Sequence, residues 1–283
     1  MSQKSYINGK ATLYLIPTPI GNMEDITYRA LNILKEVEVV FSEDTRVTRQ
    51  LLNYFNINKK LISSHNYNEE KNESKLLEYL NNGYSVGVVT DRGTPVISDP
   101  GYELVKIAIK NNYNVVSLPG ATALIPALTV SGLNPSPFTF IGFLNNKDSK
   151  RRKELEEYKN LKTTLIFYEA PHRILKTLQD IKNILGNRNI CISREISKKF
   201  EEIYRGSVIE VMNELETEEI KGEIVLVVEG NLNDTTYDNL TIIEHVNLYI
   251  KEGIDTKEAI KKVAKERKLS KSEVYNNYHR GDM

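Results

Sequence analysis

The sequence predicts an α/β protein with two α/β domains followed by a short helical segment. Its 283 residues are long for one hydrophobic core and suit two domains of ordinary size. From Thr12 to about residue 230, short apolar runs alternate with stretches of helical periodicity. Pro135 and Pro137 interrupt this alternation, because proline neither continues a helix nor donates to a sheet ladder. We therefore expect domains at 1–133 and 134–230 and a tail at 231–283.

In the first domain each apolar run is followed by a helical stretch. This order is typical of βαβ units and predicts a mostly parallel sheet with helices on both faces. The expected strands are 13–17, 37–43, 61–64, 84–89 and 114–119. The expected helices are 26–37, a stretch ending at Tyr54, 73–82, 102–112 and 121–132.

The second domain should contain a mixed sheet, because two strand-like runs follow each other with no helix between them. The expected strands are 137–143, 163–169, 189–195, 200–208 and 222–230. The expected helices are 147–160, 172–185 and a short one after residue 208. A polar linker, 231–240, then leads to three tail helices at 241–253, 255–269 and 270–280, with Asp255 and Ser270 as N-caps.

Composition narrows the classes of function. Hydrophobic residues make up 40% and charged residues 27% of the chain, and no stretch approaches the roughly 18 apolar residues of a membrane span. The N-terminus lacks an apolar signal core, so we expect a cytoplasmic protein. Cys191 is the single cysteine, which argues against a disulfide framework, a cysteine-rich zinc site or an iron–sulfur cluster. The net charge is zero, so binding of a polyanion needs local basic clusters.

Three loops that combine proline with glycine follow strands of the first domain. They span 17–22, 90–101 and 119–124. Because the carboxyl ends of parallel strands meet at one edge of a sheet, we expect these loops to form rigid main-chain walls around a cofactor. A simpler explanation exists for Asp99, which would cap the next helix with Pro100 at its first position.

The loop after the first strand also excludes a common cofactor class. It reads PTPIGN and lacks the G-x-G-x-x-G fingerprint of dinucleotide-binding folds, which disfavours a nicotinamide cofactor.

Several long motifs resemble a known family. They read LYLIPTPIGNMEDITYRALNILKEV, FSEDTRVTRQLL, TDRGTPVISDPGYELV, LPGATALIPAL, TLIFYEAPHRI, SREISKKFEE and GEIVLVVEG. In this order they are similar to the small-subunit ribosomal RNA methyltransferases I of the tetrapyrrole methylase superfamily. The resemblance runs from Ala11 through the tail. It implies the class III methyltransferase fold, S-adenosylmethionine in a cleft between the two domains, a homodimer, and 2′-O-methylation of a cytidine in the decoding centre of 16S ribosomal RNA.

The resemblance also implies cofactor contacts, motif by motif. They would be Pro19, Ile20, Gly21, Asp91, Thr94, Thr122, Ala123, Tyr168, Glu169 and Ile196. Two positions depart from the family pattern: Arg92 replaces the usual alanine of S-D-A-G-T-P, and Ala121-Thr122 replaces proline-serine. Arg92 could crowd the cleft, turn outward or reach a phosphate, and all three alternatives are open at this point.

A ribose hydroxyl is a poor nucleophile, so a group that accepts or polarises its proton is expected. The candidates are Asp44, Glu43, Glu169 and Lys198, with His172 as a further possibility. Adjacent strand residues point to opposite faces, so at most one of Glu43 and Asp44 can face the cleft. Of the two we favour Asp44. The alternative is that one of these two acids caps the following helix.

RNA recognition would use basic clusters. The candidates are Arg46, Arg49, Arg151, Arg152, Arg194, Lys198, Lys261, Lys265 and Lys271. Residues 251–280 hold nine Lys or Arg and five Asp or Glu, a net of +4. These charges could equally be solvated helix faces. Two other functions stay open: a tetrapyrrole or other small-molecule methyltransferase, and an RNA-binding assembly factor without catalysis.

Overall fold

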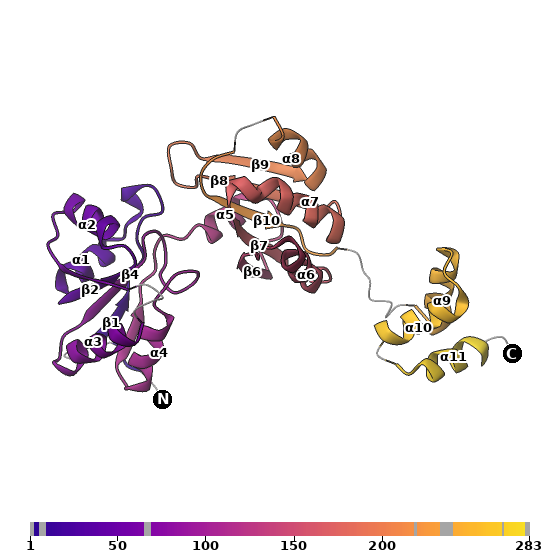
Figure 1. Ribbon diagram of the computed structural model, residues 1–283, viewed down its shortest axis with the longest axis horizontal. Coiled ribbons are helices and arrows are strands. Elements are labelled where there is room, and N and C mark those ends of the chain that lie inside the picture. Colours follow the sequence, from indigo (N-terminus) through magenta and orange to yellow (C-terminus); the bar gives the residue numbers. More distant parts are fainter. Residues whose placement is uncertain are drawn as a thin grey trace. The chain divides into compact units, whose positions relative to one another are not determined.

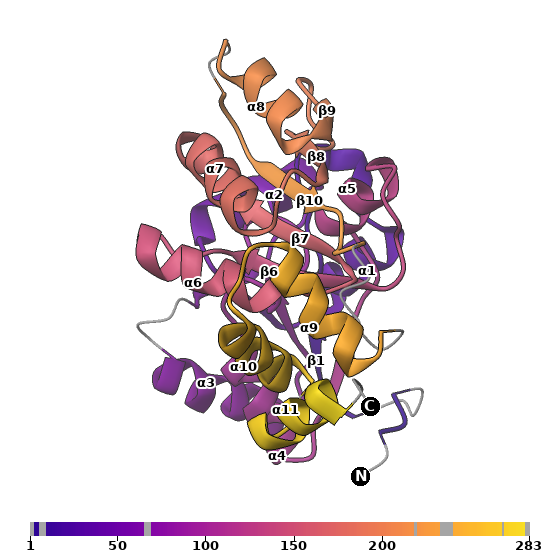
Figure 2. The same cartoon turned by 90° about the vertical axis from the view of Figure 1, so that its right-hand side faces the viewer.

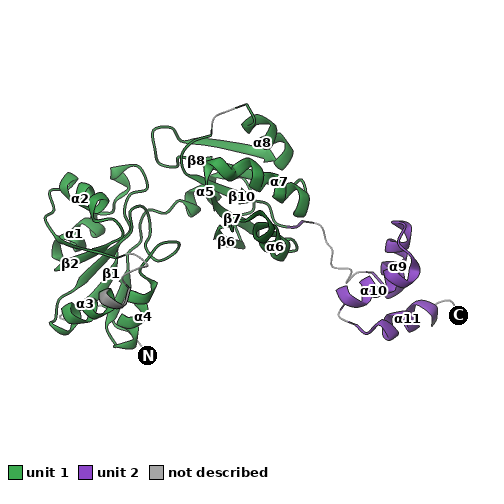
Figure 3. Ribbon diagram, in the orientation of Figure 1, with its two compact units in different colours: residues 1–230 green, residues 231–283 purple. Residues whose placement is uncertain are grey.

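The protein, seen in a computed structural model, forms two compact units, residues 1–230 and 231–283 (Figure 3). The structure describes residues 3–5, 10–64, 69–217, 220–232, 240–267 and 269–280. Most of the predicted linker 231–240 lies outside these ranges. No helix within them is long and apolar enough to cross a membrane.

A five-stranded parallel sheet forms the centre of the first lobe, by which we mean residues 10–123 (Figure 1). Its strand order is β3-β2-β4-β1-β5. The strands are β1 (Thr12–Leu15), β2 (Val39–Ser42), β3 (Lys60–Ser63), β4 (Val86–Val89) and β5 (Asn114–Ser117). The predicted parallel sheet is confirmed.

Helices cover both faces of this sheet because its buried strands carry apolar side chains on both sides. They are α1 (Tyr28–Glu36), α2 (Thr45–Tyr54), α3 (Glu69–Asn81) and α4 (Tyr102–Lys110), with a 3₁₀ turn, η1, at Met23–Asp25. Phe41 and Val88 face α3 and α4, whereas Val40 and Val89 face α1 and α2. The result is a three-layer α/β/α lobe.

The second lobe, residues 124–230, contains a five-stranded sheet of order β6-β7-β10-β8-β9. Its strands are β6 (Phe138–Phe143), β7 (Thr164–Glu169), β8 (Asn189–Arg194), β9 (Glu202–Ser207) and β10 (Ile224–Val228). The β6–β7 pair is parallel and the other pairs are antiparallel, so the predicted mixed sheet is confirmed.

Three helices cover one face of this second sheet (Figure 2). They are α6 (Asp148–Tyr158), α7 (Ile174–Ile184) and α8 (Val208–Leu215), with a second 3₁₀ turn, η2, at Pro171–Arg173. Alternate strand residues such as Leu165 and Phe167 point to these helices, while Ile166 points to the opposite face.

Helix α5 (Leu124–Val130) covers that opposite face. Ala127 and Leu128 pack with Ile166, Cys191 and Val225 of the second sheet. The boundary expected at 133/134 would place this helix in the first domain, whereas its packing joins it to the second. The difference arises because a periodic apolar stretch shows that a helix has a buried face but does not show which sheet covers it.

Unit 2 is a three-helix module with a small core of its own. Its helices are α9 (Ile242–Lys251), α10 (Thr256–Glu266) and α11 (Lys271–Arg280). Asp255 caps α10, and the Ser270 hydroxyl accepts from Glu273 N at 3.1 Å. Both predicted N-caps are confirmed.

Candidate active site

The three proline- and glycine-containing loops meet at the carboxyl edge of the first sheet. Thr18 N donates to Gly93 O at 2.9 Å, and Gly93 N donates back to Thr18 O at 3.0 Å. Thr94 Oγ1 donates to Ala121 O at 3.0 Å, which joins the third loop to the second. A Cβ on Gly120 would lie only 2.6 Å from the Pro17 ring, so glycine is required for this close approach.

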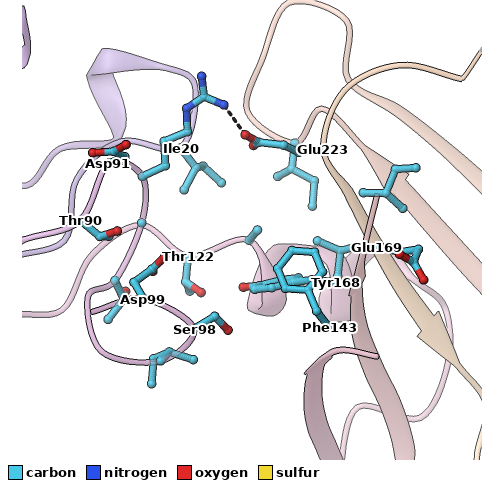
Figure 4. Close-up of a pocket in the computed structure, with 18 of the residues that line it drawn as sticks. Ile20, Thr90, Asp91, Ser98, Asp99, Thr122, Phe143, Tyr168, Glu169 and Glu223 are labelled. Atoms are coloured by element: carbon cyan, nitrogen blue, oxygen red, sulfur yellow. Dashed lines mark hydrogen bonds and ion pairs between the residues drawn. The ribbon is translucent and has the colours of Figure 1, made fainter. Parts of the chain in front are cut away.

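These loops form one wall of a cavity of about 580 Å³, and the second lobe forms the other (Figure 4). Main contributors from the first lobe are Ile20, Glu43, Thr90, Asp91, Arg92, Thr94, Ile97, Asp99 and Thr122. Main contributors from the second lobe are Phe143, Tyr168, Glu169, Ile196 and Glu223. This volume lies within the usual range for a small-molecule or cofactor pocket, roughly 300 to 1,000 Å³.

Most of the predicted cofactor contacts lie at this cavity. The ones that line it are Ile20, Asp91, Thr94, Thr122, Ala123, Tyr168, Glu169 and Ile196. Pro19 and Gly21 do not line it. Gly21 instead leaves room for the aliphatic stem of Lys198, because a Cβ at this position would collide with that side chain.

Three carboxylates, Glu43, Asp91 and Asp99, line the first-lobe wall. Glu43 Oε2 accepts from Thr90 Oγ1 at 2.7 Å. Burial raises the pKa of Asp91, although its Oδ1 accepts from the Asp44 backbone N–H at 3.0 Å. Burial, with the charge of Glu43 nearby, raises the pKa of Asp99 to about 6. Among the described residues no group of three or more His, Cys, Asp or Glu is placed to hold a metal ion.

Asp99 is a site residue that the sequence did not reveal. The motif Asp99-Pro100-Gly101 suggested a helix cap, but α4 begins at Tyr102 and its N-cap is Gly101, with no side-chain cap bond. Gly101 has φ +120°, a conformation that favours glycine. The Asp99 side chain therefore does not cap α4 and instead lines the cavity, beside Thr90.

Tyr168 faces Asp99 and Thr122 from the second lobe (Figure 4). Burial raises the pKa of its phenol, while hydrogen bonding to the Thr122 hydroxyl opposes that shift. Its ring packs against Phe140 and Phe143, with centroid distances of 5.1 and 5.5 Å. The cavity is therefore carboxylate-rich on one side and aromatic on the other.

The structure speaks against Asp44 as the base. Asp44 is the N-cap of α2, it is absent from the cavity lining, and its side chain accepts from the Arg46 backbone N–H at 2.8 Å. A hydrogen bond from the Arg46 side chain holds the pKa of Asp44 at about 2, which makes it a weak proton acceptor. Of the adjacent pair, Glu43 and not Asp44 lines the cavity, so the expectation that Asp44 faces the cleft is not met, while its role as the base stays a prediction.

Glu169 and Lys198 are also engaged elsewhere. The buried carboxylate of Glu169 accepts from Thr177 Oγ1 at 2.5 Å and from Ala170 N at 2.8 Å. Arg173 lies beside it, with Nε 3.2 Å from Oε1. This carboxylate anchors the start of α7 to the strand, and it points away from the cavity (Figure 4).

Lys198 Nζ pairs with Glu195 at 2.6 Å and with Glu223 at 3.0 Å, and Lys198 does not line the cavity. Arg92 also reaches Glu223, in an ion pair across the cavity mouth (Figure 4). Arg92 therefore points toward the second lobe, and its ion pair with Glu223 connects the two lobes. Both side chains are more than half exposed, at 52% and 60%.

The predicted RNA-contacting residues differ in accessibility. Arg151 is 2% exposed and pairs with Asp180 at 2.7 Å and Asp148 at 3.0 Å, so its assignment to an RNA-binding surface was wrong. Arg194 is largely covered and pairs with Glu202 at 2.6 Å. The exposed members of the set are Arg46, Arg49, Arg152, Lys261, Lys265 and Lys271.

Comparisons with known proteins agree with this architecture. The family model for tetrapyrrole (corrin/porphyrin) methylases matches residues 12–211. A protein of Halalkalibacterium halodurans named ribosomal RNA small subunit methyltransferase I is 47% identical, and the alignment covers 98% of this chain and 99% of that protein. The Bacillus subtilis protein of the same name is 46% identical, with 96% of each chain covered.

Solved structures are similar in fold. The crystal structure of the methyltransferase CobJ superposes with a TM-score of 0.58 at 19% sequence identity, covering 79% of this chain and 95% of that one. At this identity the similarity bears on the fold alone.

Proposed function

This chain belongs to the tetrapyrrole (corrin/porphyrin) methylase family and is a methyltransferase that uses S-adenosylmethionine, and we propose that its acceptor is RNA of the small ribosomal subunit. The specific reaction we propose is methylation of a cytidine 2′-hydroxyl in the decoding centre of 16S RNA. We further propose that the protein acts in the cytoplasm as a homodimer.

The observation that carries this proposal is the near-complete alignment with relatives named for ribosomal RNA. It spans 98% of this chain at 47% identity and therefore includes most of the C-terminal module. The CobJ methyltransferase matches only 79% of the chain. A shared catalytic fold is thus combined with a segment whose helices α10 and α11 carry exposed lysines, as an RNA-binding module requires.

The cavity fits S-adenosylmethionine on chemical grounds. The Glu43, Asp91 and Asp99 wall suits a ligand that carries a sulfonium and an ammonium, and the bonds between the loops hold that wall in place. Ile20, Asp91, Thr94, Thr122 and Tyr168 would hold the donor. When bound, it supplies a methyl group to an acceptor oxygen and leaves as a neutral thioether.

Asp99 is the residue best placed to accept the proton of the acceptor hydroxyl. Its carboxylate lines the cavity, is not used by α4, and lies beside Thr90. A pKa of about 6 keeps Asp99 mostly ionised at neutral pH while leaving it basic enough to take a proton in the transition state. The proton would then pass from Asp99 to solvent.

The proposed substrate is tested by offering separate acceptors to the purified protein with labelled S-adenosylmethionine. The acceptors are small ribosomal subunits, naked 16S RNA and a porphyrinoid precursor. We expect label in RNA, at a nucleotide that resists alkaline cleavage because its 2′-oxygen is methylated.

Label in the porphyrinoid alone would refute an RNA acceptor and support a small-molecule methyltransferase. If the protein bound RNA but failed to bind S-adenosylhomocysteine by calorimetry, a non-catalytic assembly factor would be favoured. Methylation of a base nitrogen or carbon would retain the RNA acceptor but refute ribose methylation.

A further inference from the structure

The cavity mouth exposes two large apolar side chains, one from each lobe. Ile97 of the first lobe is 57% exposed and Phe143 of the second lobe is 62% exposed, and both line the cavity. Side chains of this type are normally buried, and exposed ones gathered at a pocket mark a contact surface for a ligand. Neither side chain has a role in the proposed binding of the donor or in proton transfer.

Unusual backbone geometry positions both residues. Val96, directly before Ile97, has φ +82°, a strained conformation for a β-branched residue. Gly142, directly before Phe143, has φ +78° and follows a register shift in the β6–β7 pairing. Bulges of this kind redirect side chains, often beside active sites.

The two turns approach each other across the cavity. A Cβ on Gly142 would lie 3.7 Å from Ser98 Oγ, so the residues after Val96 and the bulge in β6 are neighbours. Figure 4 shows Ser98 and Phe143 at the lower edge of the cavity, Ser98 on the first-lobe wall and Phe143 on the second-lobe wall. Ile97, directly before Ser98, and Phe143, directly after Gly142, therefore come from neighbouring turns that both line the cavity.

Phe143 is held in place from behind. Its ring packs against Tyr168 at a centroid distance of 5.5 Å and an interplanar angle of 60°. Tyr168 is in turn fixed by Phe140 and by the Thr122 hydroxyl. A rigid aromatic ring with an open surface is a suitable platform for a planar ligand.

We propose that Ile97 and Phe143 form a clamp that stacks a planar heteroaromatic base at the cavity mouth, and that this base belongs to the acceptor nucleotide. The inference rests on the proposed RNA acceptor. A polymer must enter from solvent, and unpaired bases are commonly recognised by stacking on aromatic side chains. The adenine of the donor has the same planar chemistry, but the residues expected to hold the donor, Ile20, Thr94 and Thr122, are buried or partly buried, whereas Ile97 and Phe143 are exposed.

The chain contains no tryptophan, which allows a direct binding test. Phe143→Trp introduces a single indole at the clamp, and Tyr54→Trp, at a side chain that is 63% exposed and outside the cavity lining, is the matched control. Each variant is titrated with S-adenosylhomocysteine and, separately, with a short unpaired cytidine-containing oligoribonucleotide. We expect the oligonucleotide to quench the indole emission of the Phe143→Trp variant at least twofold, with little change for S-adenosylhomocysteine or in the control.

Quenching by S-adenosylhomocysteine alone would assign the clamp to the donor adenine and overturn the proposal. Unchanged indole emission from the clamp variant while the oligonucleotide still binds, measured by filter retention, would also overturn it. Emission that depends on protein concentration and not on either ligand would assign this surface to a second copy of the chain. Quenching by a porphyrinoid but not by RNA would refute the RNA acceptor itself, while leaving the clamp as a platform for planar ligands.

Substitutions at Phe143 give a second readout. Phe143→Ala should weaken oligonucleotide binding by roughly 5- to 150-fold, the usual range for loss of one aromatic stack. Phe143→Tyr should restore binding, and Phe143→Leu should not, because leucine fills volume without a ring face. Calorimetric affinity for S-adenosylhomocysteine should stay within twofold in all three variants. Equal binding by the Leu and Tyr variants would refute stacking.

Discussion

Replacing Asp99 by Asn should stabilise the protein at neutral pH while lowering its turnover. The carboxylate of Asp99 is partly buried near Glu43 and Asp91, and these surroundings disfavour its charged form. Asparagine has nearly the same shape and no charge. Removing the charge of a functional residue often raises stability, because the folded state holds that charge in a partly buried site near other carboxylates.

The sign and size of the effect follow from linkage. The pKa of Asp99 rises from its ordinary value of 3.8 to about 6 in the folded protein, so the folded state binds the proton more tightly than the unfolded state. Folding stability therefore falls as pH rises from about 4 to about 6, and the loss is complete above that window. The full shift corresponds to about 3 kcal/mol, and partial exposure of the side chain reduces this to about 1 to 2 kcal/mol.

Thermal unfolding of both proteins between pH 4 and pH 8 measures this difference. At pH 7.5 the Asn variant should melt about 2 to 8 °C higher, and the two curves should converge towards pH 4. Glu103→Gln, at a carboxylate on α4 that pairs with Lys106 away from the cavity, is the control. Turnover of Asp99→Asn should fall about 100- to 10,000-fold, the usual contribution of a general base.

Two results would refute this reasoning. A stability difference that does not change with pH would mean that the Asp99 carboxylate is not perturbed by its surroundings. Turnover within threefold of wild type, with unchanged affinity for S-adenosylhomocysteine, would remove Asp99 from the reaction and leave Glu43 as the cavity carboxylate to test next.

Three further predictions follow from residues outside the cavity. Asp44→Ala should lower the melting temperature by removing the α2 cap but leave single-turnover rates within threefold; a larger loss of rate would restore Asp44 as a candidate base. Removing residues 231–283 should reduce the slope of log RNA affinity against log salt by roughly 0.7 to 0.9 for each phosphate interaction that the module makes, and an unchanged slope would make the module structural only. His245 is fully buried between Arg267, whose Nε donates to Nδ1 at 3.0 Å, and Glu266, and burial lowers its pKa. The unfolded state then binds the proton more tightly than the folded state, so unit 2 should lose stability as pH falls below about 6.5. Amide exchange in α10, corrected for intrinsic rates, should therefore be faster at pH 5.5 than at pH 7.5.

Local sequence patterns were sufficient to predict the two sheets and the meeting of the three loops. Alternation of apolar runs and helical stretches specifies parallel strands, and parallel strands bring their carboxyl ends to one edge whatever their order. The meeting of the loops at Thr18, Gly93 and Ala121 follows from that geometry. The sequence could not predict which sheet α5 covers, because both sheets offer an apolar face.

Charged residues were harder to interpret, because a side chain's charge does not show what lies around it. Arg151 belongs to a run of basic residues that suggested a solvated surface, yet it is buried between Asp148 and Asp180. One signal was present: Arg151 precedes the buried Leu155 by four residues, and residues four apart on a helix share a face. A charged residue in register with the apolar positions of its helix is a candidate for a buried ion pair.

Asp99 illustrates the opposite case, in which a structural explanation concealed a site residue. Proline after aspartate is a common start of a helix, and it accounted for Asp99 without any function. The strain at Val96 and the positive φ at Gly101 delay the helix to Tyr102, so Asp99 lies in the loop and faces the cavity. The stiff connector 90–101 therefore does more than join β4 to α4. Its positive-φ residues Val96 and Gly101 help to place Ile97 and Asp99 at the cavity, where the first would meet the acceptor's base and the second its hydroxyl.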